Sequence, residues 1–307
     1  MFFLLKYGAL CDPSEQVATE LDLVGKFVKE TERHGDPVHY GRALAMQGET
    51  CHRLGKFEEA VESHLKLKEI YNIDEHSGRI IAAYASDRCA QNYGFTANCY
   101  VQLGQVDKAL EICDYIEYHI MPKMDPKNVH NSMCNVMQSL WIWRDNGMAE
   151  RSLSVFRRFV LEPFDEYFGK DGSTPHLPLF RPIEILMTLT LLLEGKVEVL
   201  DESVFDYAFD ISNVETSVKM ETALGSFCRG PMSVGAEICL ILYKLTEDPD
   251  KKKILLDNGV RLANIGISVC DGSGSDGAPK FATGYMQLEA VHRELNALHN
   301  DQHDFGS

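Results

Sequence analysis

The chain has 307 residues, of which 45% are hydrophobic and 25% charged, proportions that exclude a disordered protein and indicate a folded one. Its 30 basic and 46 acidic residues give a formal net charge of −16, which disfavours nucleic acid as a partner because an acidic surface repels phosphates. The nine cysteines are an odd number without a Cys-x-x-Cys pair, so they indicate a reducing compartment and no disulfide framework.

Neither the first residues nor the longest apolar segment predicts a membrane or secretory protein. The start, MFFLLKYGALCD, has an apolar run that is too short for a signal peptide, and it lacks the basic residues that precede such a run. Residues 183–195 are apolar but shorter than a membrane span. We therefore expect a cytoplasmic, soluble chain with no membrane partner, whose acidic charge suits basic peptides or protein surfaces.

Helical patterns follow one another along the chain, and no hairpin turn with alternating polarity predicts a strand. The first predicted helix, 13–34, begins at Asp12-Pro13, and the second, 37–54, begins at Pro37. Further helices are predicted over 57–71, 78–103, 106–120, 127–145, 148–168, 182–194, 200–226, 231–246, 249–268 and 280–298. Clustered Gly, Pro and Ser predict a joint at 169–181 and a flexible linker at 271–279, and we expect residues 301–307 to fray.

Two of these segments repeat each other. Residues 53–67 read RLGKFEEAVESHLKL, and residues 102–116 read QLGQVDKALEICDYI. Aligned on their glycines, Gly48 and Ala97 stand seven residues before the turn, and Ala60 and Ala109 stand five residues after it. Two antiparallel helices approach closely only where the facing side chains are small, and a glycine ends the first helix where φ must be positive. The pattern therefore predicts a stack of helical hairpins.

Weaker copies follow. Around Gly147 the small positions hold Leu140 and Ser152, with Trp143 and Phe156 at bulky positions, and around Gly195 only Gly-Lys-Val and the apolar spacing remain. The repeat resembles the tetratricopeptide family, although that unit is about 34 residues long and Gly55 and Gly104 are 49 residues apart. It also resembles the helical repeats beside nucleotide-binding modules in large signalling ATPases. The resemblance implies an all-α, right-handed solenoid of hairpins, with repeats over 1–168 and divergent repeats over 182–300.

The same resemblance implies a concave groove lined by the first helix of each hairpin. Its inward positions are Arg42, Ala45, Glu49, His52 and Arg53, then Gln91, Gly94, Asn98, Val101 and Gln102, then Cys134, Met137, Trp141, Arg144 and Asp145. Relatives that clamp a terminal carboxylate use a lysine where this chain has Ala45, Gly94 and Met137, so that clamp is not expected. The predicted protein-binding residues are Arg42, Glu49, His52, Arg53, Asn98, Gln102, Trp141 and Arg144. Trp141 is the predicted aromatic anchor; alternatively, it and Trp143 belong to the core.

Motifs for catalysis, metal binding or cofactors are weak. Cys51-His52 lacks an acid partner and is interpreted as a core cysteine. The single Glu-x-x-His motif, Glu289 to His292, lacks the second copy of a di-iron site, and GSG at 272–274 lacks the rest of a phosphate loop. We therefore predict a non-catalytic scaffold, without cofactor or metal, that binds a protein or peptide. Two alternatives are a regulatory segment of a larger signalling ATPase or cyclase, and a helical enzyme with a small-molecule pocket in 180–300.

Overall fold

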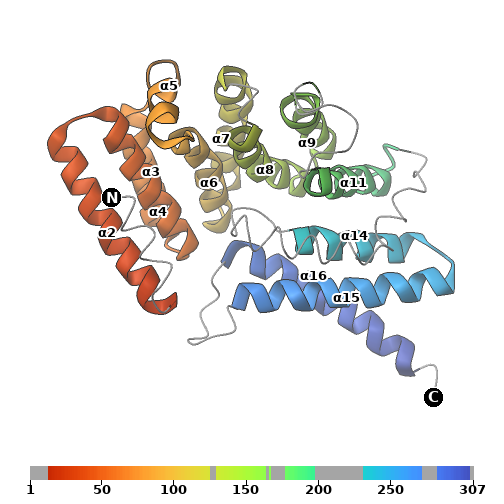
Figure 1. Cartoon of the computed structure of the whole chain (residues 1–307). Coiled ribbons are helices and arrows are strands. Elements are labelled where there is room, and N and C mark those ends of the chain that lie inside the picture. The colour runs from red at the N-terminus through yellow and green to blue at the C-terminus, as the bar shows by residue number, and fades with distance from the viewer. Residues whose placement is uncertain are drawn as a thin grey trace. The chain divides into compact units, whose positions relative to one another are not determined.

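The computed structural model describes residues 13–124, 129–163, 166, 177–197, 231–271 and 282–304, and these residues form helices and no strand (Figure 1). The all-α class predicted from the sequence is confirmed. The described residues fall into two compact units, the first reaching residue 166 and the second beginning at residue 177.

The first unit begins with α2 (Pro13–His34), α3 (Pro37–Arg53), α4 (Phe57–Ile70), α5 (Ile73–Tyr84) and α6 (Arg88–Gln102). It continues with α7 (Val106–Tyr115), the π-helical turn η2 (Ile116–Ile120), the 3-10 turn η3 (Met121–Lys123), α8 (Val129–Asp145), α9 (Ala149–Phe156) and the π-helical turn η4 (Arg157–Leu161). The bounds of α2, α3 and α4 agree with the predicted helices to within one residue. The second unit comprises α11 (Leu177–Leu193), α14 (Pro231–Leu245), α15 (Pro249–Asp271) and α16 (Ala282–Asp304).

The turns that end α3, α6, α8 and α11 share one hydrogen-bond pattern. At Gly55, whose φ is 72°, the glycine N–H donates to the carbonyl of His52 (3.0 Å) and the N–H of Lys56 donates to that of Cys51 (2.9 Å). The same two bonds, three and five residues back, close the turns at Gly104, Gly147 and Gly195, where φ lies between 69° and 77°. This is the Schellman termination that a left-handed glycine allows. The predicted positive φ is confirmed at all four glycines.

The small residues of the repeat lie inside the hairpins. Ala60 is 3% exposed, and Ala97 and Ala109 are fully buried. A Cβ added to Gly48 would lie 3.1 Å from the Asn92 amide nitrogen and 3.5 Å from the carbonyl oxygen of Ala60. In the third hairpin the Ser152 hydroxyl donates to the Leu140 carbonyl across the pair (3.0 Å). The predicted close approach of the two helices is therefore confirmed by the burial of these residues.

Successive hairpins pack on one another within the first unit. Helix α3 packs on α4, α6 on α7, and α8 on α9, while α6 also contacts α3, α4 and α8 (Figure 1). Large apolar side chains fill the layers between them, and Leu44, Leu67, Ile116, Trp143 and Phe156 are each at most 1% exposed. Because α6 touches both helices of the preceding hairpin, its side chains belong to two layers at once.

The predicted helix over 78–103 is wrong: the chain breaks between α5 and α6. Ala85 adopts a left-handed conformation (φ 62°), and Asp87 then caps α6 by accepting a hydrogen bond from the backbone N–H of Ala90 (3.0 Å). The Asp87 carboxylate also accepts from the Tyr71 hydroxyl (2.7 Å). The additional helix α5 contacts α3 and α6, and it explains why the first two turn glycines are 49 residues apart (Gly55 to Gly104).

Other boundaries also differ from the predictions. Helix α11 begins at Leu177 and contains Pro182, so the second part of the predicted joint at 169–181 is helical. Helix α16 extends to Asp304, so most of the predicted frayed tail at 301–307 is helical too. The predicted helix over 200–226 and residues 272–279 of the predicted linker lie outside the described residues.

The second unit packs differently from the hairpins of the first. Helix α14 contacts α11, α15 and α16. A Cβ on Gly259 of α15 would lie 3.0 Å from Leu295 and 3.1 Å from Cys239, so three helices meet there at close range. The connection from α14 to α15 contains Thr246 and Asp248 but no glycine, and the Asp248 side chain accepts hydrogen bonds from the N–H groups of Asp250 and Lys251. The glycine turn of the repeat is therefore not used at this connection.

Candidate protein-binding face

The first helices of three successive hairpins are joined by a chain of polar side chains. The Asn98 amide of α6 donates to Gln138 Oε1 of α8 (3.2 Å), and its oxygen lies 3.2 Å from His52 Nε2 of α3. Because the amide nitrogen of Asn98 is the donor toward Gln138, its oxygen is the acceptor toward His52. Gln138 is itself only 4% exposed and holds Asn98 in place, and we call the surface formed by the half-buried Arg42, Glu49, Arg88 and Asn98 the polar face.

Charged side chains of α3 and α6 extend the polar face beyond Asn98. Arg88, the first residue of α6, places Nη1 3.4 Å from Glu49 Oε2, and both side chains are largely covered. Arg42 lies on the same helix as Glu49, and its guanidinium carbon is 5.6 Å from the centre of the Tyr84 ring of α5. Two arginines and one glutamate are thus placed together where α3, α5 and α6 meet.

A buried network next to the polar face sets how α3, α4 and α6 pack. Asn92 of α6 donates to the carbonyl of Ala45 (3.0 Å), and its oxygen lies 2.8 Å from Nδ1 of His64 in α4. Burial lowers the pKa of His64 to about 4, although the bond to Asn92 opposes this shift. His64 is therefore neutral at physiological pH and donates through Nδ1. These bonds hold the three helices in one register.

The structure places the predicted binding residues at different depths. Arg42, Glu49, Asn98, Gln102 and Arg144 are half-buried, whereas His52 is 6% exposed and Trp141 is 5% exposed. The side chain of Arg53 lies outside the described residues. Trp141 was predicted as a surface anchor, but an indole buried to this degree is unavailable to a partner. Trp143, which is fully buried, fills the core of the third hairpin.

Sequence reasoning missed Arg88, Gln138 and Tyr84. Arg88 follows the capping residue Asp87, and the undivided helix predicted over 78–103 concealed that this position begins a new helix. Tyr84 ends α5, which was not predicted as a separate element. Gln138 stands nine residues before Gly147, a spacing that the family resemblance does not assign to the groove. The Ser86-Asp87 pair was the one local signal for the break.

The residues considered for chemistry are engaged in packing. Cys51 is 2% exposed, and burial together with Glu59 raises the pKa of its thiol to about 11, so it is protonated at neutral pH. His292 Nε2 lies 2.9 Å from the amide nitrogen of Asn296, which engages the lone pair that a metal would need. Within the described part of the chain, no cluster of His, Cys, Asp and Glu side chains has the arrangement of a metal site.

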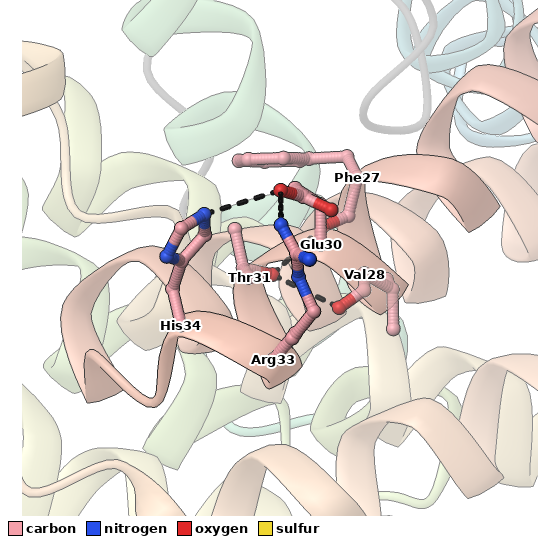
Figure 2. Close-up of polar contacts among 6 residues, drawn as sticks. All are labelled: Phe27, Val28, Glu30, Thr31, Arg33 and His34. Atoms are coloured by element: carbon pink, nitrogen blue, oxygen red, sulfur yellow. Dashed lines mark hydrogen bonds and ion pairs between the residues drawn. The ribbon is translucent and has the colours of Figure 1, made fainter.

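Polar contacts also gather at the end of α2, as Figure 2 shows. The Glu30 carboxylate accepts a hydrogen bond from Arg33 (2.7 Å) and lies 3.1 Å from His34 Nε2, while Thr31 donates to the carbonyls of Phe27 (2.8 Å) and Val28 (3.1 Å). The Glu30 group is exposed, and Arg33 and His34 lie in the last turn, where positive charge favours the helix. These contacts stabilise the end of α2 and do not form a binding site.

Comparison with known protein families, curated proteins and solved structures finds no match for this chain. In the segments that the structure describes, none of the helices combines the length and the apolar character needed to cross a membrane.

Proposed function

We propose that the first unit is a tetratricopeptide-like, right-handed solenoid that binds a segment of another protein along the polar face and catalyses no reaction itself. The repeated Schellman turns carry this proposal. The same turn recurs at Gly55, Gly104 and Gly147, and α6 contacts both α3 and α8, which supports a row of first helices, one layer after another. Such a row presents side chains at regular intervals to an extended chain.

The polar face suits a polypeptide partner. Asn98 carries an amide, and Arg42, Arg88 and Glu49 carry both signs of charge, all on helices packed against neighbouring layers. Amide and charged side chains at fixed intervals match the peptide groups and side chains of an extended segment, and a rigid surface loses little entropy on binding. We propose a cytoplasmic location because the described cysteines Cys51, Cys89, Cys99, Cys113 and Cys239 are all free and buried.

The test is selection from a library of random twelve-residue peptides with the whole chain as bait, followed by affinity measurements with the recovered peptides. A face variant, Glu49→Ala with Asn98→Ala, changes two half-buried positions of the polar face on α3 and α6. The control, Lys108→Ala with Glu111→Ala, changes two exposed positions on α7, the second helix of its hairpin. We expect the face variant to weaken binding at least tenfold and the control to leave it unchanged. Recovery of no specific peptide, or equal loss in both variants, would refute the proposal.

A further inference from the structure

Large side chains are exposed on the second helices of the first two hairpins. Tyr118 in η2 is 62% exposed, Tyr115 at the end of α7 is 37% exposed, and Leu65 on α4 is 49% exposed. Apolar and aromatic side chains that are exposed singly are normal, whereas those that gather on one surface mark an interaction site. The question is therefore whether these three residues share a surface.

Contacts between neighbouring helices bring them together. The ammonium group of Lys68 in α4 lies 5.8 Å from the centre of the Tyr115 ring, and Leu65 stands three residues before Lys68, on the same side of α4. The guanidinium carbon of Arg151 in α9 lies 5.7 Å from the centre of the Tyr118 ring. The exposed residues thus form a row over α4, α7 and η2, and we call Leu65, Tyr115 and Tyr118 the tyrosine patch.

Both tyrosine rings are held by their own neighbours. Tyr115 stacks on the buried ring of Tyr93, with 5.2 Å between the ring centres. Arg151, beside Tyr118, is itself fixed by two hydrogen bonds to Glu117 (2.9 and 2.6 Å). Tyr118 lies in a π-helical turn, a distortion that is frequent at functional sites. Rings that are already held lose little entropy when a partner covers them, which favours binding.

The helices that carry the tyrosine patch are acidic. Helix α4 contains four acidic residues and two lysines, and α7 with η2 contains four acidic residues and one lysine. The neighbouring cations leave an excess of negative charge, because Arg151 meets the two carboxylates of Glu117 and Asp114 (2.6 and 2.7 Å). Lys123 of η3 is paired with Asp74, and the arginines of η4 belong to a turn that packs on α8 and α9. This surface therefore attracts basic residues.

We propose that the tyrosine patch is a second protein-binding surface of the first unit and that it binds a basic segment of a partner. Lys and Arg side chains are attracted to the face of an exposed tyrosine ring and to the surrounding carboxylates, while their aliphatic stems cover apolar side chains such as Leu65. The tyrosine patch lies on second helices, whereas the polar face lies on the first helices α3 and α6. One chain can therefore hold two segments at different surfaces.

The test compares two libraries of twelve-residue peptides with the whole chain as bait. One library has Lys or Arg fixed at four positions, and the other has Asp or Glu at the same positions. We expect only the basic library to yield peptides whose affinity falls about tenfold or more with Tyr118→Ser. The control is Ile254→Ser, which changes another exposed apolar residue, on α15 of the second unit, and should leave their affinity unchanged.

Leu65→Ser is a second variant on a different helix, and it should weaken the same peptides about threefold or more. If Tyr118→Ser lowers the melting temperature, Leu65→Ser decides. Three results would overturn the proposal: no basic peptide is recovered, the basic peptides keep their affinity for both variants, or the acidic library yields peptides with the same dependence on Tyr118. Basic peptides that lose affinity with Glu49→Ala and Asn98→Ala instead would bind the polar face, which would also overturn the tyrosine patch.

Discussion

At the scale of single residues, the turn glycines and the buried histidine explain most about how the hairpins hold together. Gly104 has a φ of 70°, and an added Cβ there would meet no atom within 4 Å, so the glycine is required by backbone conformation alone. Gly78 lies inside α5 with equally free space and an ordinary helical backbone. Because an added Cβ is uncrowded at both glycines, a difference between the two substitutions reports the effect of backbone conformation.

We predict opposite effects of the same substitution at these two glycines. Gly104→Ala should lower the free energy of unfolding by about 1–2 kcal/mol, because an L-residue is strained in the left-handed region. Gly78→Ala should raise it by about 0.5–1 kcal/mol, since alanine stiffens the helix interior. Urea titration of both variants measures the difference. Equal effects in the two would contradict the role of the left-handed turn.

His64 predicts a dependence of stability on pH. Its pKa is lowered to about 4 by burial, below the value of about 6.5 that it has when unfolded. As the pH falls, the unfolded chain therefore binds a proton at His64 before the folded chain does. The contribution of neutral His64 to stability is complete above pH 6.5 and is lost as the pH falls toward 4. Between pH 7 and pH 5 the free energy of unfolding should fall by about 2 kcal/mol more in the native chain than in His64→Gln. Parallel pH profiles in urea titrations would show that His64 is not buried in its neutral form.

At the scale of elements, the contact between the paired helices depends on short side chains. Ala109 of α7 is fully buried against α6, whereas Ala83 near the end of α5 is exposed. Ala109→Arg forces a long charged side chain between two packed helices and should destabilise the chain by several kcal/mol, roughly 3 or more. Ala83→Arg makes the same chemical change and should have no measurable effect. Circular dichroism melting curves of the two variants provide the comparison.

The elements also show which helix boundaries local sequence patterns predict and which they do not. The bounds of α2 and α3 followed from the proline and acidic residues at their starts, because capping uses only neighbouring residues. The break before α6 did not follow, because Ala85 adopts a left-handed conformation that the alanine itself disfavours. Asp87 holds this break partly through Tyr71, which is sixteen residues away. A bond between such distant residues is not apparent in a local window.

At the scale of the whole molecule, the described residues belong to two compact units. Three of the four repeated turns and the polar face lie in the first, where each layer contacts its neighbours. A fragment of residues 1–167 should therefore unfold cooperatively on its own and retain peptide affinity within about threefold of the whole chain. Thermal melts followed by circular dichroism, with the selected peptides as probes, test this. A fragment without a cooperative melt would show that the first unit depends on the second.

The sequence by itself determined that the chain is helical and that hairpins repeat around glycines, because helix periodicity, caps and small-residue spacing are local properties of the chain. It also predicted Arg42, Glu49 and Asn98 as inward positions, because a repeat carries its inward positions with it. Only the tertiary structure decided that Trp141 is buried, that Arg88 lies beside Glu49, and that Nε and Nη1 of Arg42 are buried without an acceptor. Burial and unpaired charge depend on which side chains from distant helices fill the same space, and no spacing along one chain specifies that.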